Sequence, residues 1–478
     1  MLRVLALSLL FISQALAAGP KIAIVIGSKA TTMDKLAAEQ LRTDFGLLFD
    51  AESTIEATVP KDAANVVLVG SPYSNAAIPK EPIEKLSVQG HLLKSTDRGL
   101  IVGGGSPTAT FWAAGELSYR FGIRHLLHGD VLPVEKPAFT LQGFDVVLEP
   151  KVRERGWSMY NGSATGAESW GTEEHLKLIK QLAKLKFTHL LVPKNPTRLA
   201  PLAVDGDTAG RKVFAGARLF PNADTTKELN ADAKALGLLV EPIGLVTHSL
   251  GAHSPSVLPL VLPESLNLRM QNLLKFHGTR LTVGAITPGD LNTATHFVSR
   301  ICFDDKMTFD QALNDLVTPI CGEGVVERFQ KGLYLIGDAA KLIEANDASF
   351  GIPGANMMRR YLDAKESLPT WITEAKTHYT NAMNEMYRAN TRAREGARPF
   401  ILYHAKRLEF ALHYCTAIES LYKAHDKAVR AESIEAAVEA MYNALNAYAD
   451  VARDPSDHGA IALLNEHGYR ALTKIAAE

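Results

Sequence analysis

The order of the predicted elements constrains the fold of this chain most. Strands and helices alternate over roughly the first 300 residues, and helices alone follow. Such alternation is typical of α/β folds built on a parallel sheet. In the first block, residues 18–149, one predicted helix has clear ends. Ser106 is a residue type favoured as a helix cap, Pro107 is favoured in the first turn, and Gly122 is favoured just after a helix end. Strands are predicted at 21–27, 65–72 and 99–105, and helices at 33–48 and 106–122. We therefore expect a small α/β domain over residues 18–149.

A glycine run at 103–105 lies directly before the second of these helices, where a phosphate-binding loop would also place glycines. Neither a following Lys-Ser/Thr pair nor the GxGxxG spacing is present, and phosphate-binding loops have one or the other. A tight turn between strand and helix is the favoured interpretation. We expect no cofactor.

The second block, residues 150–300, continues the alternation. Strands are predicted at 155–163, 188–193, 238–246 and 280–287, and helices at 173–187 and 225–237. This order is that of the first strands of a parallel (β/α) barrel, in which chemistry sits at the carboxyl ends of the strands. Only about 25 residues separate the loop at 247–255 from the last strand, too few for the remaining strands of a full barrel. The block is predicted to be a shortened TIM-type barrel.

Several segments of these two blocks resemble glycoside hydrolases. The segment 99–133 is similar to the end of the small α/β domain that precedes the catalytic barrel in bacterial β-N-acetylhexosaminidases of family 20 and in α-glucuronidases. Segments 178–192 and 241–252 are similar to the first helix with the second strand, and to the third-strand region, of that barrel. The match rests on the order of several weak motifs over about half the chain. It implies a carbohydrate-active protein.

The resemblance also implies residues that contact a sugar. Arg155 matches the first-strand arginine that binds sugar hydroxyls in these families, and its planar fork of donors can bridge two neighbouring hydroxyls. An arginine at a domain junction is an equally open alternative. His248 matches a histidine of the third-strand loop, although the residue before it departs from the families' glycine. Trp157, Tyr160 and Trp170 are candidates for a stacking floor, and packing at the mouth of the barrel is the alternative.

The catalytic residues of the families have no clear counterpart. The hexosaminidases have an adjacent Asp-Glu pair, in which Glu is the general acid and Asp orients the acetamido group of the substrate. This chain contains no Asp-Glu dipeptide. Because glycoside hydrolysis needs two carboxyl groups beside one bond, Glu241 and Asp290 are the best remaining candidates, with a structural or solvated role as the alternative. We predict weak or absent glycosidase activity, with sugar affinity retained through Arg155 and His248.

The third block, residues 301–478, is predicted to be a helical bundle. Apolar and aromatic residues recur every seven positions from Ile401 to Tyr422, which is typical of a bundle seam. Near the end of the chain, Asp454, Asp457 and His458 form a polar group. A helix-cap loop is the favoured interpretation, and a contact onto a sugar cleft is the alternative. The predicted fold class is thus α/β plus all-α.

Charge and cysteine content exclude some classes of function. The formal net charge is -1, which argues against a large non-specific nucleic-acid surface because such surfaces neutralise phosphates. The three cysteines, Cys302, Cys321 and Cys415, form no CxxC pair, and their odd number leaves at least one thiol unpaired. We expect buried, structural cysteines and no metal site.

The N-terminus has the features of a secretory signal. Arg3 precedes an apolar run at 4–12, and Ala15 and Ala17 place small residues at the two positions that a signal peptidase reads. The run is shorter than the roughly 20 residues that span a bilayer. We expect a signal peptide at 1–17, a mature chain from Ala18 and a secreted or periplasmic location, with a buried N-terminal strand as the alternative.

Together these observations predict a secreted carbohydrate-active protein that acts on or binds amino-sugar or uronic-acid glycans. The alternative is a non-catalytic sugar-binding or scaffold protein. The expected partner is an oligosaccharide or polysaccharide, with no nucleic acid and no membrane anchor. The sugar, the anomer, the stereochemical course and the oligomeric state are left open.

Overall fold

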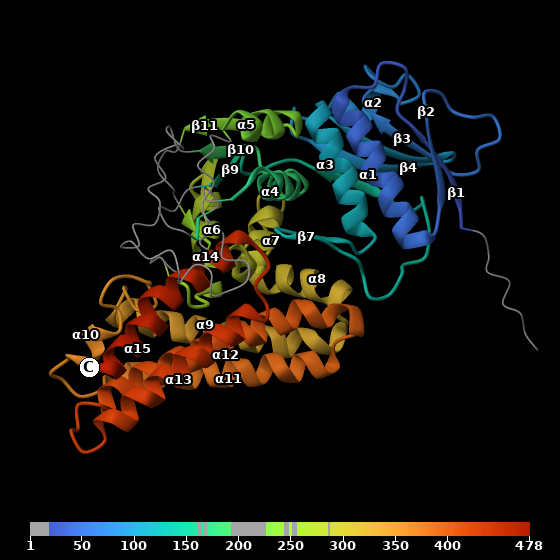
Figure 1. Ribbon diagram of the computed structural model, residues 1–478. Coiled ribbons are helices and arrows are strands. Elements are labelled where there is room, and N and C mark those ends of the chain that lie inside the picture. Colours follow the sequence, from blue (N-terminus) through green and yellow to red (C-terminus); the bar gives the residue numbers. More distant parts are fainter. Residues whose placement is uncertain are drawn as a thin grey trace, which may run out of the picture.

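The structure, a computed structural model, describes residues 19–159, 165–166, 170–192, 226–242, 248–250, 256–284 and 287–478. Its elements form three parts in chain order, namely a sheet with helices, a second sheet of parallel strands, and a group of long helices (Figure 1). The predicted succession of α/β and helical regions is confirmed.

A six-stranded sheet forms the N-terminal part, with strand order β2-β1-β3-β5-β4-β8. The first four strands in this order run parallel, whereas β4 runs antiparallel to both β5 and β8. The strands are β1 (Lys21–Val25), β2 (Glu52–Glu56), β3 (Val66–Gly70), β4 (His91–Thr96), β5 (Gly99–Gly104) and β8 (Asp145–Leu148). Smaller elements are α2 (Lys80–Ile83), β6 (Arg124–Leu126) and β7 (Gly129–Val131).

Two long helices, α1 (Thr32–Phe49) and α3 (Pro107–Arg120), lie side by side against this sheet (Figure 1). Ser106 caps α3 as predicted, because its hydroxyl accepts a hydrogen bond from the N–H of Ala109 at 3.2 Å. Gly122 follows the helix with a φ of +96°, a conformation that favours glycine. The local signals in the sequence therefore set both ends of α3.

The second sheet contains five parallel strands in the order β11-β10-β9-β13-β12. They are β9 (Glu154–Ser158), β10 (His189–Val192), β11 (Leu239–Pro242), β12 (His248–Ser249) and β13 (Arg280–Gly284). The helices of this part are α4 (Thr172–Lys184), α5 (Thr226–Ala235), α6 (Pro263–Lys275) and α7 (Asn292–Ile301), with a 3₁₀ turn at Pro288–Leu291.

This sheet is open in the described part of the chain. Strands β11 and β12 stand at its two ends, and no pairing between them is found among the described residues. A closed TIM-type barrel is therefore not confirmed. Chain length agrees with this, because β12 and α6 already occupy much of the segment 243–279, and each further parallel strand needs a crossover of a dozen or more residues.

The two faces of this sheet differ in character, because alternate residues of a strand point to opposite faces. On one face, Arg155 and Trp157 of β9 are 2% and 1% exposed and pack into the protein interior. On the other face, the carboxylate of Glu154 pairs with Arg280 of β13, and both side chains are almost half exposed. The second face thus has an accessible ion pair, whereas the interior of a complete barrel is filled with apolar side chains.

The C-terminal part is helical throughout. Its main helices are α8 (Phe309–Cys321), α9 (Val326–Asn346), α11 (Thr370–Arg392), α12 (Arg398–Lys423) and α13 (Arg430–Ala449). Shorter helices are α10 (Arg359–Leu362), α14 (Pro455–Leu464) and α15 (Arg470–Ala477), with 3₁₀ turns at Glu323–Val325 and Glu395–Ala397 and a π-helical turn at Asn465–Tyr469.

Helices α9, α11, α12 and α13 pack in that order. Figure 1 shows them as one group of long helices. The seam predicted from the seven-residue repeat is confirmed, because Ile401, Leu408 and Cys415 are fully buried and Tyr422 is half-buried. Within the described residues, no helix combines the length and the apolar character that a membrane span needs.

Candidate functional site

The carboxyl ends of the parallel strands are where a fold of this kind places its chemistry. Most residues that directly follow these strands lie outside the described part of the chain, and Tyr160 is one of them. For His248 the structure describes the backbone, which pairs with Val283 of β13. Sugar contact by Tyr160 and His248 stays a prediction.

A buried group of polar side chains lies just beyond the carboxyl end of β13. We call it the strand-end cluster, and it consists of Asp290, Tyr403, Arg407, Tyr448 and Asp457. Its centre is an ion pair in which Nε of Arg407 lies 3.0 Å from Oδ1 of Asp290, and Nη2 lies 2.7 Å from Oδ2. The hydroxyl of Thr287 also donates to Oδ2, at 2.9 Å. Both oxygens of Asp290 are therefore occupied.

The two tyrosines connect this ion pair to the start of α14. The hydroxyls of Tyr403 and Tyr448 lie 3.3 and 3.0 Å from Oδ1 of Asp457. Tyr403 also packs against Gly289, where a Cβ would lie 2.3 Å from the tyrosine oxygen. The absence of a side chain at Gly289 therefore allows the helical part to approach the end of the sheet.

Asp454 and Asp457 have the capping role that the sequence favoured. Asp454 is the N-cap of α14 and accepts a hydrogen bond from the N–H of Asp457 at 2.9 Å. The other oxygen of Asp454 lies 2.6 Å from Nε2 of His128 in the N-terminal part. Beside it, Nε1 of Trp170 donates to the hydroxyl of Ser456 at 2.9 Å. The start of α14 is thus held to both preceding parts of the chain.

Burial raises the pKa of Asp457 to about 7, and the nearby charge of Asp454 acts in the same direction. Arg407 opposes this shift. Raised carboxyl pKa values occur in general acids as well as in structural networks. Asp457 is fully buried, with its oxygens bonded to Tyr403, Tyr448 and the N–H of Arg453, which describes a structural network.

Glu241 belongs to a different group, on the polar face of the open sheet. Its carboxylate forms an ion pair with Arg280, the first residue of β13, and lies 3.6 Å from Nε2 of His189. Arg280 also pairs with Glu154 of β9 at 3.1 Å. Burial lowers the pKa of His189, while the charges of the two glutamates oppose that shift.

The structure does not bring the two candidate catalytic carboxylates together. Glu241 pairs with the arginine at the amino end of β13, whereas Asp290 follows the carboxyl end of that strand and pairs with an arginine of α12. The register of the strands places the backbone of Glu241 level with Gly284 at the carboxyl end of β13, so it is the ion pairs, not the strand positions, that keep the two carboxylates apart.

Arg155 lies at a domain junction, which was the alternative to sugar contact. Its guanidinium donates to the carbonyl of Lys186 at 2.6 Å, to the carbonyl of Val152 at 2.6 Å and to Oε1 of Gln89 at 2.9 Å. It also lies over the ring of Trp112 of α3, at 5.1 Å from the centroid. These contacts hold the N-terminal sheet against the second one, and sugar contact by Arg155 stays a prediction that they do not support.

The candidate stacking residues are also enclosed. Trp157 packs edge-on against Phe187, with ring centroids 5.6 Å apart, and is 1% exposed. Trp170 is 4% exposed. Both tryptophans therefore have the packing role that was the alternative to sugar stacking.

Three members of the strand-end cluster, Arg407, Tyr403 and Tyr448, are not among the residues predicted from the sequence. One signal was present, because Tyr403 and Arg407 are four residues apart and so share one helix face with the aromatic residues Phe410 and Tyr414, away from the apolar seam. A polar pair on a buried face requires partners elsewhere in the fold. The partners of this pair, Asp290 and Asp457, are brought to it by the tertiary structure.

As for metals, no group of three or more ligand side chains is found among the described residues, and independence of metal stays a prediction.

Comparison with known proteins supports the fold alone. No family model and no curated protein matches the sequence. Among solved structures, a family GH115 4-O-methyl-α-glucuronidase with specificity for decorated arabinogalactans is similar, with a TM-score of 0.65 and 13% identity over 94% of this chain and 80% of that one. A GH138 enzyme targeting pectin rhamnogalacturonan II has a TM-score of 0.48 and 9% identity over 96% and 100% of the two chains.

The first of these similarities shows a fold like that of a glycoside hydrolase, in agreement with the α-glucuronidase part of the expected resemblance. The expected resemblance to family 20 hexosaminidases is not shown.

Proposed function

We propose that this chain binds glycans containing uronic acids and does not cleave them. One observation carries the proposal: the carboxylates of Glu241 and Asp290 belong to two separate ion pairs, one with Arg280 and the other with Arg407. The fold supports a carbohydrate ligand, because a 4-O-methyl-α-glucuronidase has a similar structure. Because that enzyme is a glucuronidase, the similarity favours a uronic acid over an amino sugar as the ligand.

The reason for expecting no hydrolysis is geometric. Glycosidases hold two carboxyl groups about 5 to 9.5 Å apart on either side of the scissile bond. Asp290 is 3% exposed, and the fork of Arg407 contacts both of its oxygens, so it can neither attack a sugar nor transfer a proton without losing this pair. Glu241 is more accessible, but its carboxylate is held by Arg280 and does not face Asp290 in a shared ion pair.

Hydrolysis is the second candidate function, and Asp457 is the residue that favours it. A carboxyl group with a pKa of about 7 is still protonated in part at neutral pH, as a general acid must be. Its burial and its bonds to two tyrosines make this role the weaker one.

The test of the proposal measures turnover and binding with the same purified chain. Aryl α-D-glucuronides and aryl N-acetyl-β-D-glucosaminides are the substrates, and we expect no release of the aryl group above a buffer control. Turnover that Glu241→Gln or Asp457→Asn abolishes, in variants with unchanged circular dichroism, would contradict the proposal and identify the catalyst.

Isothermal calorimetry with oligosaccharides from glucuronoxylan and from chitin then separates the ligand classes. We expect heat of binding with the acidic xylan fragments and little with the chitin fragments. Absence of binding to both would leave a scaffold role and overturn glycan binding.

A further inference from the structure

A pocket lies between the N-terminal part and the helical part, away from the ends of the parallel strands. We call it the junction pocket. It is framed by the end of α3, the segment at 133–137, the end of α8 and the end of α11. The N–H of Val134 donates to the carbonyl of Pro319 at 2.9 Å, and Pro133 lies where a Cβ on Gly122 would come within 2.9 Å. The frame is therefore closely packed.

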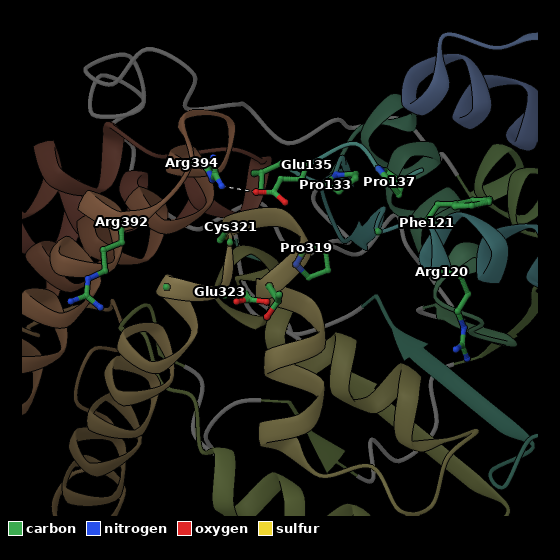
Figure 2. Close-up of a pocket in the computed structure, with 15 residues that line it drawn as sticks. Arg120, Phe121, Pro133, Glu135, Pro137, Pro319, Cys321, Glu323, Arg392 and Arg394 are labelled. Atoms are coloured by element: carbon green, nitrogen blue, oxygen red, sulfur yellow. Dashed lines mark hydrogen bonds and ion pairs between the residues drawn. The ribbon is translucent and has the colours of Figure 1, made fainter. Parts of the chain in front are cut away.

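The size and the walls of the pocket suit a sugar. Its volume is about 650 Å³, within the range of pockets that hold small ligands. Phe121, Pro133, Pro137 and Pro319 give it apolar surface, as Figure 2 shows, and the C–H faces of sugar rings pack against such surface. Glu323 can accept hydrogen bonds from hydroxyl groups.

Three arginines also line the pocket, together with two glutamates. Arg394 is neutralised by Glu135, whose carboxylate lies 2.5 Å away across the boundary between the two parts. Figure 2 shows this pair on one side, with Arg120 and Arg392 at opposite ends of the pocket. Arg392 is exposed, and no carboxylate pairs with it among the residues that the structure describes.

Arg120 is paired, but its partner does not depend on it. Its Nε lies 3.0 Å from Oε1 of Glu116. The same carboxylate is bound by Lys186 at 2.6 Å and by Arg300 at 2.7 Å, and both of these cations are largely buried. Because Glu116 is shared by three cations, Arg120 can turn to another anion while Glu116 stays paired. Among the three cations that share Glu116, Arg120 is the one that is accessible enough to bind a ligand, because its side chain is 41% exposed.

The region behind Arg120 has an excess of positive charge. Burial lowers the pKa of Arg124 to about 9, and the charges of Arg300 and Arg120 lower it further against the opposing effect of Glu116. Burial likewise lowers the pKa of Lys186 to about 8, with Glu116 opposing. Arg124 pairs with Asp315 at 3.2 Å, and Arg120, Lys186 and Arg300 share Glu116. These four cations thus have two carboxylates, and an additional anion near Arg120 would stabilise them.

We propose that the junction pocket binds a carboxylate-bearing oligosaccharide, with Arg120 and Arg392 holding acidic groups toward its two ends. Guanidinium groups bind carboxylates through two parallel hydrogen bonds, which explains why arginine suits this place. The inference rests on the proposed function in taking the ligand to be a glycan. It adds the place of binding, which is outside the strand ends.

The test compares acidic and neutral sugars of equal length. Trigalacturonate and galactotriose are titrated into the full chain by calorimetry, with inorganic phosphate as a third ligand. We expect trigalacturonate to bind, with an affinity that falls as salt is raised, and galactotriose and phosphate to bind at least tenfold more weakly. Loss of one charge-assisted hydrogen bond typically costs about tenfold to hundredfold in affinity.

The variants Arg120→Gln and Arg392→Gln are each expected to weaken binding of trigalacturonate by about that factor. Arg388→Gln is the matched control, because Arg388 lies on α11 one turn before Arg392 and pairs with Glu385 outside the pocket. Arg388→Gln should bind like the unchanged chain. Circular dichroism of each variant shows that folding is retained.

Several results would overturn the inference. Equal affinity for galactotriose would show that the acid groups are not recognised, and equal affinity for phosphate would show that the sugar is not. Unchanged affinity in both Arg120→Gln and Arg392→Gln would place the ligand elsewhere and leave the proposed function standing. The proposed function falls separately, if no glycan binds to the chain or if the chain cleaves one.

Discussion

Arg407, in the middle of α12, holds both carboxylate oxygens of Asp290, which follows β13 in the sheet. The two residues are 117 positions apart and are 0% and 3% exposed. Arg407 also donates to the carbonyl of Val257, at 2.5 Å. The pair therefore joins the second sheet to the helical part at their common boundary. Although burial alone would lower the pKa of Arg407, the charge of Asp290 outweighs it and raises this pKa well above its usual value.

Asp290→Asn should destabilise the fold strongly. The change leaves Arg407 buried without an opposite charge, and removing one partner of a buried ion pair typically costs about 3–5 kcal/mol. Urea denaturation followed by circular dichroism measures the free energy of unfolding. The matched control is Asp305→Asn, whose exposed pair with Lys151 at 3.7 Å should contribute less than about 1 kcal/mol. Equal stability of the two variants would contradict the structural role given to Asp290.

Local signals in the sequence were sufficient for elements whose ends depend on neighbouring residues. Ser106 and Gly122 set the ends of α3, and the repeat from Ile401 to Tyr422 identified one of the buried faces of α12. In such cases the hydrogen bond or the apolar contact is made within a few residues or one helix face. The shortened TIM-type barrel predicted from chain length is not confirmed, because the described strands form an open sheet.

The candidate site could not be predicted to the same extent, because its partners come from distant parts of the chain. The resemblance placed Arg155 on the correct strand, but alternation along β9 turns its side chain toward Trp112 and Gln89 of the N-terminal part. A barrel-strand position makes Asp290 a candidate in the sequence, but its partner Arg407 lies in another block. A single sequence does not show which buried charges meet.

Asp457 should make the protein less stable as pH rises. Its pKa is about 7 in the folded chain, above the 3.8 usual for aspartate. Between these values the folded state holds a proton that the unfolded state has released, so the free energy of unfolding falls from about pH 4 to pH 7. Asp457→Asn, which resembles the protonated form, should flatten this dependence.

Urea denaturation at several pH values between 4 and 8 measures this effect. Part of the slope should remain in the variant, because burial also raises the pKa of Asp315 to about 7, with the charge of Glu116 adding to it. An Asp457→Asn variant with the same pH dependence as the unchanged chain would show that Asp457 is ionised when folded.

Glu116→Gln should be among the most damaging single substitutions. Glu116 is 1% exposed and is the carboxylate that Arg120, Lys186 and Arg300 share. Burial alone would raise its pKa, but these cations outweigh burial and hold the pKa well below 4.5. The stabilisation is therefore present above about pH 4.5 and is lost as pH falls below it.

At pH 7 we expect a loss of about 3–5 kcal/mol in Glu116→Gln, since three cations would then lie together without an anion. Chemical denaturation measures it, with Glu264→Gln as the control because Glu264 is exposed and pairs with Lys341. A loss no larger than that of the control would show that the cations find other partners.

Export can be tested at the N-terminus of the protein made in a cell that processes secretory signals. Ala15 and Ala17 have the spacing of a signal-peptidase site, so the mature chain should start at Ala18, within a residue or two. Mass spectrometry of the intact exported protein measures this start. A protein that retains Met1 would contradict export through such a signal.

The three thiols should be unreactive in the folded protein and accessible in the unfolded one. Cys302, Cys321 and Cys415 are free and fully buried, and burial raises the pKa of each thiol to about 12. Since the thiolate is the form that reacts, both its scarcity and its burial slow modification. A chromogenic disulfide reagent should therefore label the native chain slowly and label three thiols at once in guanidinium chloride.

Cys321 tests the junction pocket as well, because it lines that pocket. Rapid labelling of Cys321 alone in the native chain would show that the pocket opens far enough to expose this thiol, whereas fewer than three thiols in the unfolded chain would contradict the free state of the cysteines.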